Sequence, residues 1–321
     1  MISKKFTILL ILTFFTLLVK AQSEQEVLPA EKKNMTIITE PYTLYKGFFR
    51  TGMSFNYSAL YKFFNDDGDK VPVSNASGRS WAAQLLLQYG INDRLQVTTG
   101  IPYMRQDLFL SYLGEAPGLG LFQQQKLEGN GSGLSDIWLG LDYQIMEATT
   151  TKPAIKLMFT GTFPTGAKNP VEMDDPDIMD IAVGAGHFSL EGGFAMRKIN
   201  YPYSWTTYVT YKVNLEGEKQ FYVDGPLTPF RDGNMLTVSG SFNFHMNEWL
   251  AITNDIYYFN IATDYEDGQA MDNTASWLVE YAPRLSFQIK RLRVNQSIQI
   301  PLIGKMAGAD PGFILIVQYV L

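Results

Sequence analysis

Residues 80–105 read SWAAQLLLQYGINDRLQVTTGIPYMR, and this stretch decides the class of fold. In its first half, the apolar side chains that share one face are Trp81, Ala83, Leu85, Leu87 and Tyr89. The other face carries Ser80, Gln84 and Gln88, and the alternation resumes after a short turn at residues 91–93. A period of two indicates strands with two different faces, and so short a turn joins antiparallel neighbours. The stretch therefore predicts a β-hairpin with one apolar face.

The same alternation recurs along the chain. Its blocks lie near residues 49–63, 80–90, 94–105, 134–146, 153–165, 180–197, 203–214, 234–246, 249–261, 275–289, 292–301 and 312–321. The connections alternate between short and long, so tight turns gather on one rim and long loops, such as residues 106–133, on the other. A soluble β-sandwich would have shorter strands, of about 5 or 6 residues. We therefore expect an all-β fold over residues 48–321, a transmembrane up-and-down antiparallel β-barrel of about 12 strands.

The composition excludes several classes of function. None of the 321 residues is cysteine, which rules out a disulfide scaffold, a thiolate zinc site and a cysteine nucleophile. A formal net charge of −6 disfavours a surface that binds nucleic acid. The glycine-rich residues 129–133 lack the Gly-Lys-Ser/Thr of a phosphate-binding loop, so we expect a flexible loop there. The sequence predicts no cofactor and no metal site.

The N-terminus has the pattern of a secretory signal peptide. Lys4 and Lys5 precede an apolar run, residues 6–19, that is too short to span a bilayer, and Ala21 is a small residue at the cleavage point. We expect residues 1–21 to be removed during export. The alternative is a membrane anchor that stays attached.

Residues 22–47 are mostly polar and would lie in the periplasm. They could form a short plug or a tether, and disorder is the simplest account of a terminus rich in Gln, Glu and Lys. The barrel would sit in the outer membrane of a Gram-negative cell, surrounded by outer-membrane lipid and lipopolysaccharide. Apolar surface that faces lipid resembles apolar surface that faces a second subunit, so the oligomeric state stays open.

Three short motifs stand in order within residues 79–170. They are residues 89–95 (YGINDRL) running to 101–103 (IPY), residues 133–140 (GLSDIWLG) and residues 163–166 (FPTG). These motifs resemble the MetA-pathway of phenol degradation family, whose members are outer-membrane barrels described as transporters. The family pattern more often has glycine where Ser135 stands. The resemblance implies a barrel that passes small molecules, and it does not imply phenol chemistry.

If the apolar face meets lipid, the other face of each strand points into the lumen, where water or internal pairing tolerates charge. The ionisable residues that we expect to line the lumen are Arg50, Lys62, Asp136, Asp142, Lys156, His187, Glu191, Arg197, Lys212, His245, Asp255, Glu280, Arg284 and Arg293. For Asp255 the strand is ambiguous, because Asn254 interrupts its apolar face. Both signs of charge occur, so strong ion selectivity is not predicted. Each residue either lines a pore or forms a salt bridge that props the wall.

His187 and Ser189 form a His-x-Ser pair, with Glu191 and Asn200 nearby. Outer-membrane phospholipases use such a pair with an asparagine, and the imidazole acts as general base for the hydroxyl. Such an active site would have to face lipid. The apolar face of this strand is the opposite one, so we expect His187 and Ser189 to point inward.

Residues 172–180 carry five acidic side chains in a predicted outer loop. Oxygen-rich clusters can hold Ca²⁺, but the spacing of an EF-hand is absent. We expect a loop that is solvated or bridged to lipopolysaccharide by divalent cations.

The expected function is passive or facilitated passage of small molecules, hydrophobic ones among them. The width and charge of the lumen would filter the solute, and no chemical step is involved, so we do not expect an enzyme. One alternative is a structural or surface-interaction barrel whose lumen is closed by the charges named above. The other is an outer-membrane lipid hydrolase that uses His187 and Ser189.

Overall fold

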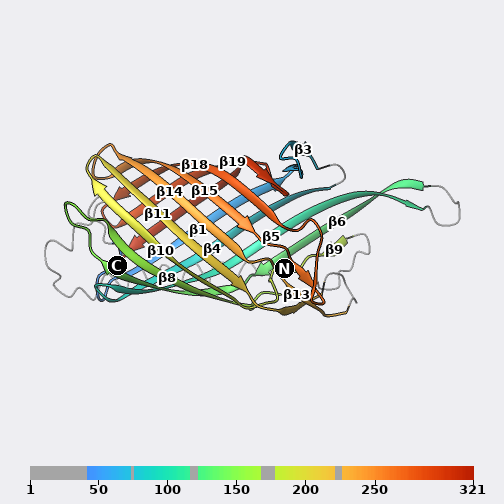
Figure 1. Ribbon diagram of the computed structural model, residues 1–321, viewed down its shortest axis with the longest axis horizontal. Coiled ribbons are helices and arrows are strands. Elements are labelled where there is room, and N and C mark those ends of the chain that lie inside the picture. The colour runs from blue at the N-terminus through green and yellow to red at the C-terminus, as the bar shows by residue number, and fades with distance from the viewer. Residues whose placement is uncertain (1–41, 74–75, 116–121, 168–177, 221–225) are drawn as a thin grey trace, which may run out of the picture.

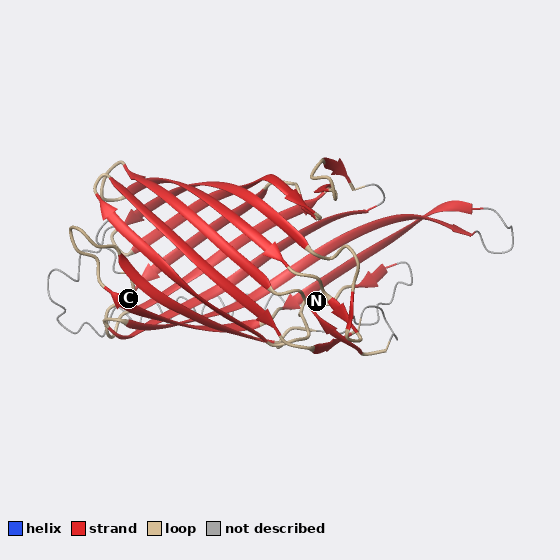
Figure 2. Ribbon diagram, viewed as in Figure 1, coloured by secondary structure: helices blue, strands red, loops and turns tan. Residues whose placement is uncertain are grey.

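The computed structural model describes residues 42–73, 76–115, 122–167, 178–220 and 226–321. Within these residues, twelve strands form one closed barrel whose neighbouring strands run antiparallel, as Figures 1 and 2 show. No helix of the described residues is long and apolar enough to cross a lipid bilayer. The barrel strands are β1 (Phe49–Leu60), β4 (Ala76–Asn92), β5 (Leu95–Glu115), the interrupted strand β6 (Phe122–Leu134) and β7 (Ile137–Met146), β8 (Ala154–Phe163), β10 (Ser189–Asn200), β11 (Tyr203–Asn214), β14 (Met235–His245), β15 (Leu250–Ile261), β18 (Ser276–Ile289), β19 (Leu292–Lys305) and β21 (Gly312–Val320).

The sheet closes in the order of the chain. Each barrel strand pairs with the one before it and the one after it, and β1 returns to β21. That last register runs from Arg50 opposite Val320 to Tyr57 opposite Phe313. Closure leaves no open edge in the wall, which is required in lipid because lipid offers no hydrogen bonds to backbone groups. The predicted up-and-down barrel is confirmed, and so is its strand number.

The two faces of each strand meet different surroundings. On β15, the outward side chains of Ile252 and Ile256 are 41% and 54% exposed, whereas the inward Thr253 and Asp255 are each 1% exposed. On β8, the outward Phe159 is 56% exposed. An apolar exterior around a polar interior is the arrangement of a barrel that crosses lipid.

The two rims differ as the sequence predicts. The turn rim, as we call it, carries short connections such as residues 201–202 and 290–291, and the C-terminus lies there (Figure 1). The loop rim at the other end carries the long connections, which form two small sheets of their own. The short strands at the loop rim are β2 (Lys62–Phe64), β3 (Lys70–Pro72), β9 (Ile178–Asp180), β12 (Gly217–Lys219), β13 (Thr228–Arg231), β16 (Tyr265–Glu266), β17 (Gln269–Ala270) and β20 (Ala307–Gly308).

The β5–β6 hairpin corrects the predicted loop over residues 106–133. Its antiparallel ladder continues to Glu115 opposite Phe122, and the hairpin extends beyond the loop rim (Figure 1). The glycine-rich residues 129–133 belong to β6 rather than to a flexible loop. Glycine is depleted in strands unless another backbone approaches closely. Here a Cβ at Gly131 would lie 2.0 Å from the carbonyl oxygen of Ile181, so the glycine makes room for the incoming chain.

The barrel wall changes partner between β6 and β7. β5 pairs with β6 toward the loop rim and with β7 toward the turn rim. At the junction, the Asp136 carboxylate accepts backbone N–H groups from Gly166 at 2.9 Å and Ala185 at 2.8 Å. The chain that follows β8 is thereby fastened to the wall. For this reason β10 begins only at Ser189, later than the predicted start near residue 180.

Candidate functional site: the lumen and its mouth

The mouth of the barrel at the turn rim is partly filled by residues 42–48, which we call the mouth segment. Its apolar anchor is Leu44, which is 1% exposed and packs with Phe48 and Val320. The backbone N–H of Leu44 donates to Oε1 of Gln96 at 2.7 Å. The segment is therefore held by the inner wall of β5 and by the end of β21.

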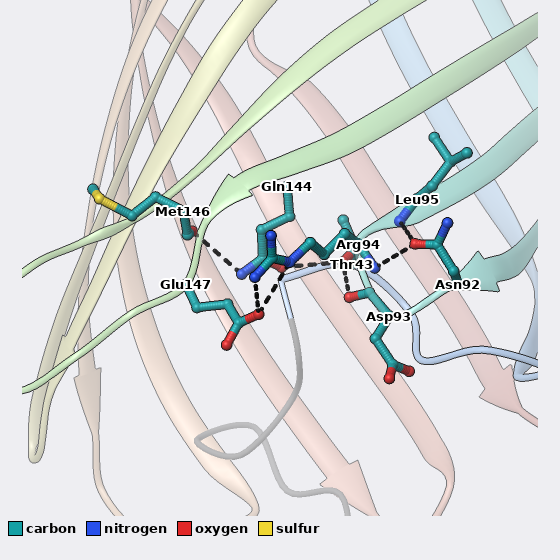
Figure 3. A network of polar contacts seen from close by, with 8 residues as sticks. All are labelled: Thr43, Asn92, Asp93, Arg94, Leu95, Gln144, Met146 and Glu147. Carbon is teal, nitrogen blue, oxygen red and sulfur yellow. Dashed lines mark hydrogen bonds and ion pairs between the residues drawn. The ribbon is translucent and has the colours of Figure 1, made fainter.

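A second contact ties the mouth segment to the neighbouring turns. The Thr43 hydroxyl donates to Oε1 of Gln144 at 3.1 Å, and Thr43 is 1% exposed. Figure 3 shows this contact beside the ion pair of Arg94 with Glu147, whose side chains lie 3.1 Å apart. Two exposed turns and a buried threonine thus form one polar network at the rim.

Tyr42 brings an aromatic ring into the lumen. The Lys156 Nζ atom lies 5.0 Å from the ring centroid, and the guanidinium carbon of Arg197 lies 4.6 Å from it. Cations at these distances are attracted to the ring face. Burial raises the pKa of the Tyr42 hydroxyl, so the ring stays neutral at physiological pH. The mouth segment is thereby joined to the inner faces of β8 and β10.

One lumen cavity, of about 250 Å³, carries negative charge, and we call it the carboxylate cavity. Its lining includes Asp142, Glu191 and Trp138, and none of its lining residues is Lys or Arg. The Asp142 carboxylate accepts hydrogen bonds from Lys156 Nζ at 2.8 Å and from Gln96 Nε2 at 2.9 Å. One of the two carboxylates is therefore balanced by a neighbouring cation.

A second cavity, of about 380 Å³, carries positive charge, and we call it the arginine cavity. None of its lining residues is Asp or Glu. Its cationic and aromatic lining residues are Arg197, Arg284, Arg293, Tyr42, Tyr208 and Tyr257. Serine, threonine, asparagine and glutamine side chains complete the lining. The cavity therefore combines hydrogen-bond donors, positive charge and flat apolar rings.

Charged and polar contacts fix two of the lining groups. Arg284 Nη2 lies 3.2 Å from the carboxylate of Asp255, which is 1% exposed and also accepts a hydrogen bond from the Ser241 hydroxyl. His245 Nε2 lies 2.8 Å from Oγ of Ser204. Both contacts are inside the barrel, so they orient the wall of the arginine cavity.

The structure gathers most of the predicted lumen residues around the two cavities. Those that line a cavity are Asp142, Glu191, Arg197, His245, Arg284 and Arg293. Those that contact a lining residue are Arg50, whose guanidinium donates to Gln88 at 3.2 Å, Lys156 and Asp255.

Two of the other predicted residues stand opposite a lining residue in the sheet, and three lie at the loop rim or at a junction. Glu280 stands opposite Tyr257 and accepts a hydrogen bond from Gln299 Nε2 at 2.9 Å. Lys212 stands opposite Glu191, on β11 toward the loop rim. Asp136 holds the β6–β7 junction. Lys62 lies on β2 in a small sheet of the loop rim and is exposed. His187 lies in the connection before β10.

The pair His187 and Ser189 does not form the geometry of a hydrolase. His187 Nε2 lies 2.6 Å from the carboxylate of Asp232, and Nδ1 has no hydrogen-bond partner among the described residues. A general base must lie within hydrogen-bond reach of the hydroxyl whose proton it accepts, and neither ring nitrogen of His187 is hydrogen-bonded to Ser189. Asn200 is the last residue of β10, at the turn rim, whereas His187 precedes the other end of that strand. The three groups are thus not assembled.

The contact of His187 with Asp232 shapes the charge of the loop rim. Burial acts to raise the pKa of Asp232, but the hydrogen bond and the charge of His187 outweigh it and hold that pKa below its ordinary value. Asp232 lies in the connection between β13 and β14, outside the spanning strands. The pair therefore fastens two loops at the loop rim to each other.

Within the described residues, no group of three or more His, Asp or Glu side chains could hold a metal ion. Residues 172–177, the main part of the predicted acidic loop, lie outside the described residues.

For residues 22–47 the sequence leaves a short plug or a tether open and favours disorder, and it does not predict that residues 42–47 dock in the mouth. Tyr42, Leu44 and Tyr45 stand close together at the end of this stretch. That local apolar cluster before the first strand was the available signal.

A closed barrel with an apolar exterior and a polar, charged lumen defines the class of this chain as a transmembrane β-barrel protein. The family profile described as "Putative MetA-pathway of phenol degradation" matches residues 98–291, which is more than half of the chain. The chain belongs to this family, and the resemblance found in its three motifs is confirmed.

Solved structures agree on the fold. The crystal structure of the COG4313 outer membrane channel from Pseudomonas putida F1 is similar with a TM-score of 0.61 at 15% identity, over 92% of this chain and 99% of that chain. The toluene transporter TodX of Pseudomonas putida gives a TM-score of 0.45 at 11% identity, over 89% and 92% of the two chains. The first likeness concerns the barrel fold, and the second is too low to carry an argument. A comparison with curated proteins found no match.

Proposed function

We propose that the protein is an outer-membrane channel through which small solutes, hydrophobic ones among them, pass by diffusion. The observation that carries the proposal is the pair of cavities in the lumen, of about 250 and 380 Å³. Side chains fill the interior of many small barrels. Here the mouth segment and the inward side chains do not fill the lumen completely. The family and the barrel fold support the same reading.

The proposal includes the location. Residues 1–21 would be removed on export, residues 22–47 would begin on the periplasmic side, and residues 48–321 would form the barrel in the outer membrane of a Gram-negative cell. The rims support this orientation, since short turns face the periplasm and long loops face outward in such barrels. Lipid would surround the apolar band, and lipopolysaccharide would adjoin the loop rim.

Selection in such a channel follows from width and charge. Solute would pass the carboxylate of Glu191 in one cavity and the guanidinium groups of Arg197, Arg284 and Arg293 in the other. Groups of opposite sign across a narrow lumen orient a polar solute and weaken overall ion selectivity. No bond is made or broken in this process.

Single-channel recording in planar bilayers tests the proposal. Purified, folded protein should give steady ohmic current steps, and Glu191→Gln should shift the reversal potential in a salt gradient toward anions. The matched control is Glu248→Gln, which removes the same charge from an exposed turn away from the mouth segment. Silence from inserted protein whose fold is verified would refute the channel function.

A second candidate function is a structural barrel with a closed lumen. The mouth segment favours it, because Leu44 and Thr43 are both fully buried in the barrel mouth. The same recordings decide between the two. If the wild type is silent and Leu44→Ala is silent too, then the lumen is closed by more than the mouth segment, and the loops become the candidate interaction surface.

A further inference from the structure

We propose that the arginine cavity binds small carboxylates that carry an apolar ring or chain, and that it acts as a selectivity site of the channel. The role in transport rests on the proposed channel function, whereas the binding itself does not. The argument uses the charge of the cavity, its aromatic wall and the way its arginines are held.

The charge of the cavity selects an anion. Three guanidinium groups, of Arg197, Arg284 and Arg293, line one space of about 380 Å³, and none of the lining residues is acidic. Guanidinium groups bind carboxylates with paired, charge-assisted hydrogen bonds. A cation would meet like charge on this wall. A volume of this size is in the range of pockets that hold small molecules.

The rings of the cavity select an apolar body on that anion. Tyr208 and Tyr257 both line the space, with ring centroids 6.4 Å apart and planes inclined by 59°. Tyr42 enters the lining from the mouth segment. Aromatic rings favour contact with flat apolar groups, and their edges suit a further ring. An inorganic anion or acetate would leave these faces without a partner.

One arginine is held ready for a ligand. The contact of Arg284 with the buried Asp255 fixes the direction of its guanidinium group. Arg284 Nε is buried and has no hydrogen-bond partner among the described residues. A donor that is already oriented loses little freedom when a ligand binds. The Arg284 side chain as a whole is 30% exposed, so a carboxylate in the cavity can reach its guanidinium group.

The carboxylate cavity strengthens the preference. Lys156 balances Asp142 there at 2.8 Å, whereas Glu191 lines the cavity with no Lys or Arg among its lining residues. Glu191 repels a carboxylate solute, and the arginine cavity attracts it. The charged end of the solute is therefore directed to one side of the lumen.

Three probes of related shape test the ligand chemistry on the full-length, unmodified protein. Benzoate has both a ring and a charge, benzamide has the ring without the charge, and acetate has the charge without the ring. Binding to detergent-solubilised folded protein is measured by titration calorimetry, and block of ion current is measured in planar bilayers. Benzoate should bind at least about tenfold more tightly than either of the others, because benzamide cannot form the charged hydrogen bond and acetate cannot form the buried ring contact.

Two matched variants locate the site. Arg293→Gln removes one guanidinium from the cavity and should weaken benzoate binding about tenfold or more. Lys290→Gln removes one positive charge from an exposed turn of the same rim, away from the mouth segment, and should leave benzoate binding unchanged. Arg197→Gln is a second cavity variant, for use if the first does not fold.

The outcomes separate the inference from the channel function. Benzoate binding without any conductance would support the site and refute the channel. Normal conductance with equal binding of benzoate and benzamide would refute the site and leave the channel intact. Acetate that binds as well as benzoate would refute the role of the tyrosines. Equal effects of Arg293→Gln and Lys290→Gln would show that general charge, and not this cavity, attracts the anion.

Discussion

Leu44 anchors the mouth segment, and its truncation to alanine should release that segment from the barrel. The side chain is 1% exposed where the segment is docked, in contact with Phe48 and Val320. In the released segment it would lie in water, so the substitution penalises the docked state alone. The loss of a buried leucine costs about 2 kcal/mol at the low end of the observed range. That energy corresponds to about a 30-fold larger released population.

The complete absence of cysteine from the chain makes a direct assay available. Thr43→Cys places one thiol at a position that is 1% exposed, and a maleimide can reach it only when the segment is released. The modification rate follows the released population when docking is fast relative to the reaction. We expect Leu44→Ala to raise that rate about 30-fold. Single-channel recordings should show a matching rise in time spent in the highest conductance level.

A modification rate within twofold of the parent would refute this reasoning, because it would mean that Leu44 does not hold the segment. Leu227→Ala is the matched control, since Leu227 is 48% exposed at the loop rim and should leave the rate unchanged. Gly90→Ala gives an independent perturbation. A Cβ there would lie 2.0 Å from the carbonyl oxygen of Tyr45, so it should displace the segment without removing any apolar group.

Three other substitutions have expected outcomes. Gly131→Ala should lower the free energy of unfolding in denaturant by about 2 kcal/mol through overpacking, whereas Gly240→Ala, with nothing within 4 Å of its Cβ, should change it by less than about 0.5 kcal/mol. Arg284→Met should cost about 2 kcal/mol because Asp255 stays buried without its partner, and adding Asp255→Asn should recover most of that loss. Asp232→Asn should lower the thermal stability at neutral pH. The lowered pKa of Asp232 stabilises the fold above the ordinary pKa of the group, and this is lost as the pH falls through the lowered pKa, so variant and parent should converge in acid.

The strands and their faces were predictable because lipid and lumen impose opposite requirements on neighbouring positions. On β15 the alternation continues through Asn254, which interrupts the apolar face in the sequence. Asn254 lies on the outward face, and its side-chain oxygen accepts a hydrogen bond from the Tyr281 hydroxyl at 2.6 Å. A local partner therefore satisfies that oxygen on the apolar face.

Contacts across the lumen were not predictable, because they depend on how the sheet closes. Asp142 and Lys156 stand on adjacent strands, so a register argument could pair them. Tyr42 meets Lys156 and Arg197 only because the mouth segment turns into the barrel. The connection before β10 escaped prediction for a similar reason. Its backbone binds to Asp136 on a distant strand, and no period in the sequence records that contact.

The mouth segment and the arginine cavity share Tyr42, and this links their two equilibria. Tyr42 lines the cavity, and it keeps that place only while the segment is docked. A ligand that contacts the ring must then bind the docked state more tightly than the released one. By linkage, docking of the segment and binding of the ligand favour each other equally. The factor by which docking raises the affinity for the ligand equals the factor by which bound ligand raises the docking equilibrium constant. A saturating carboxylate ligand would therefore slow modification of a thiol at position 43. The factor should equal the ratio of the ligand's affinities for the docked and the released segment, and a Leu44→Ala variant whose segment is fully released measures the second affinity.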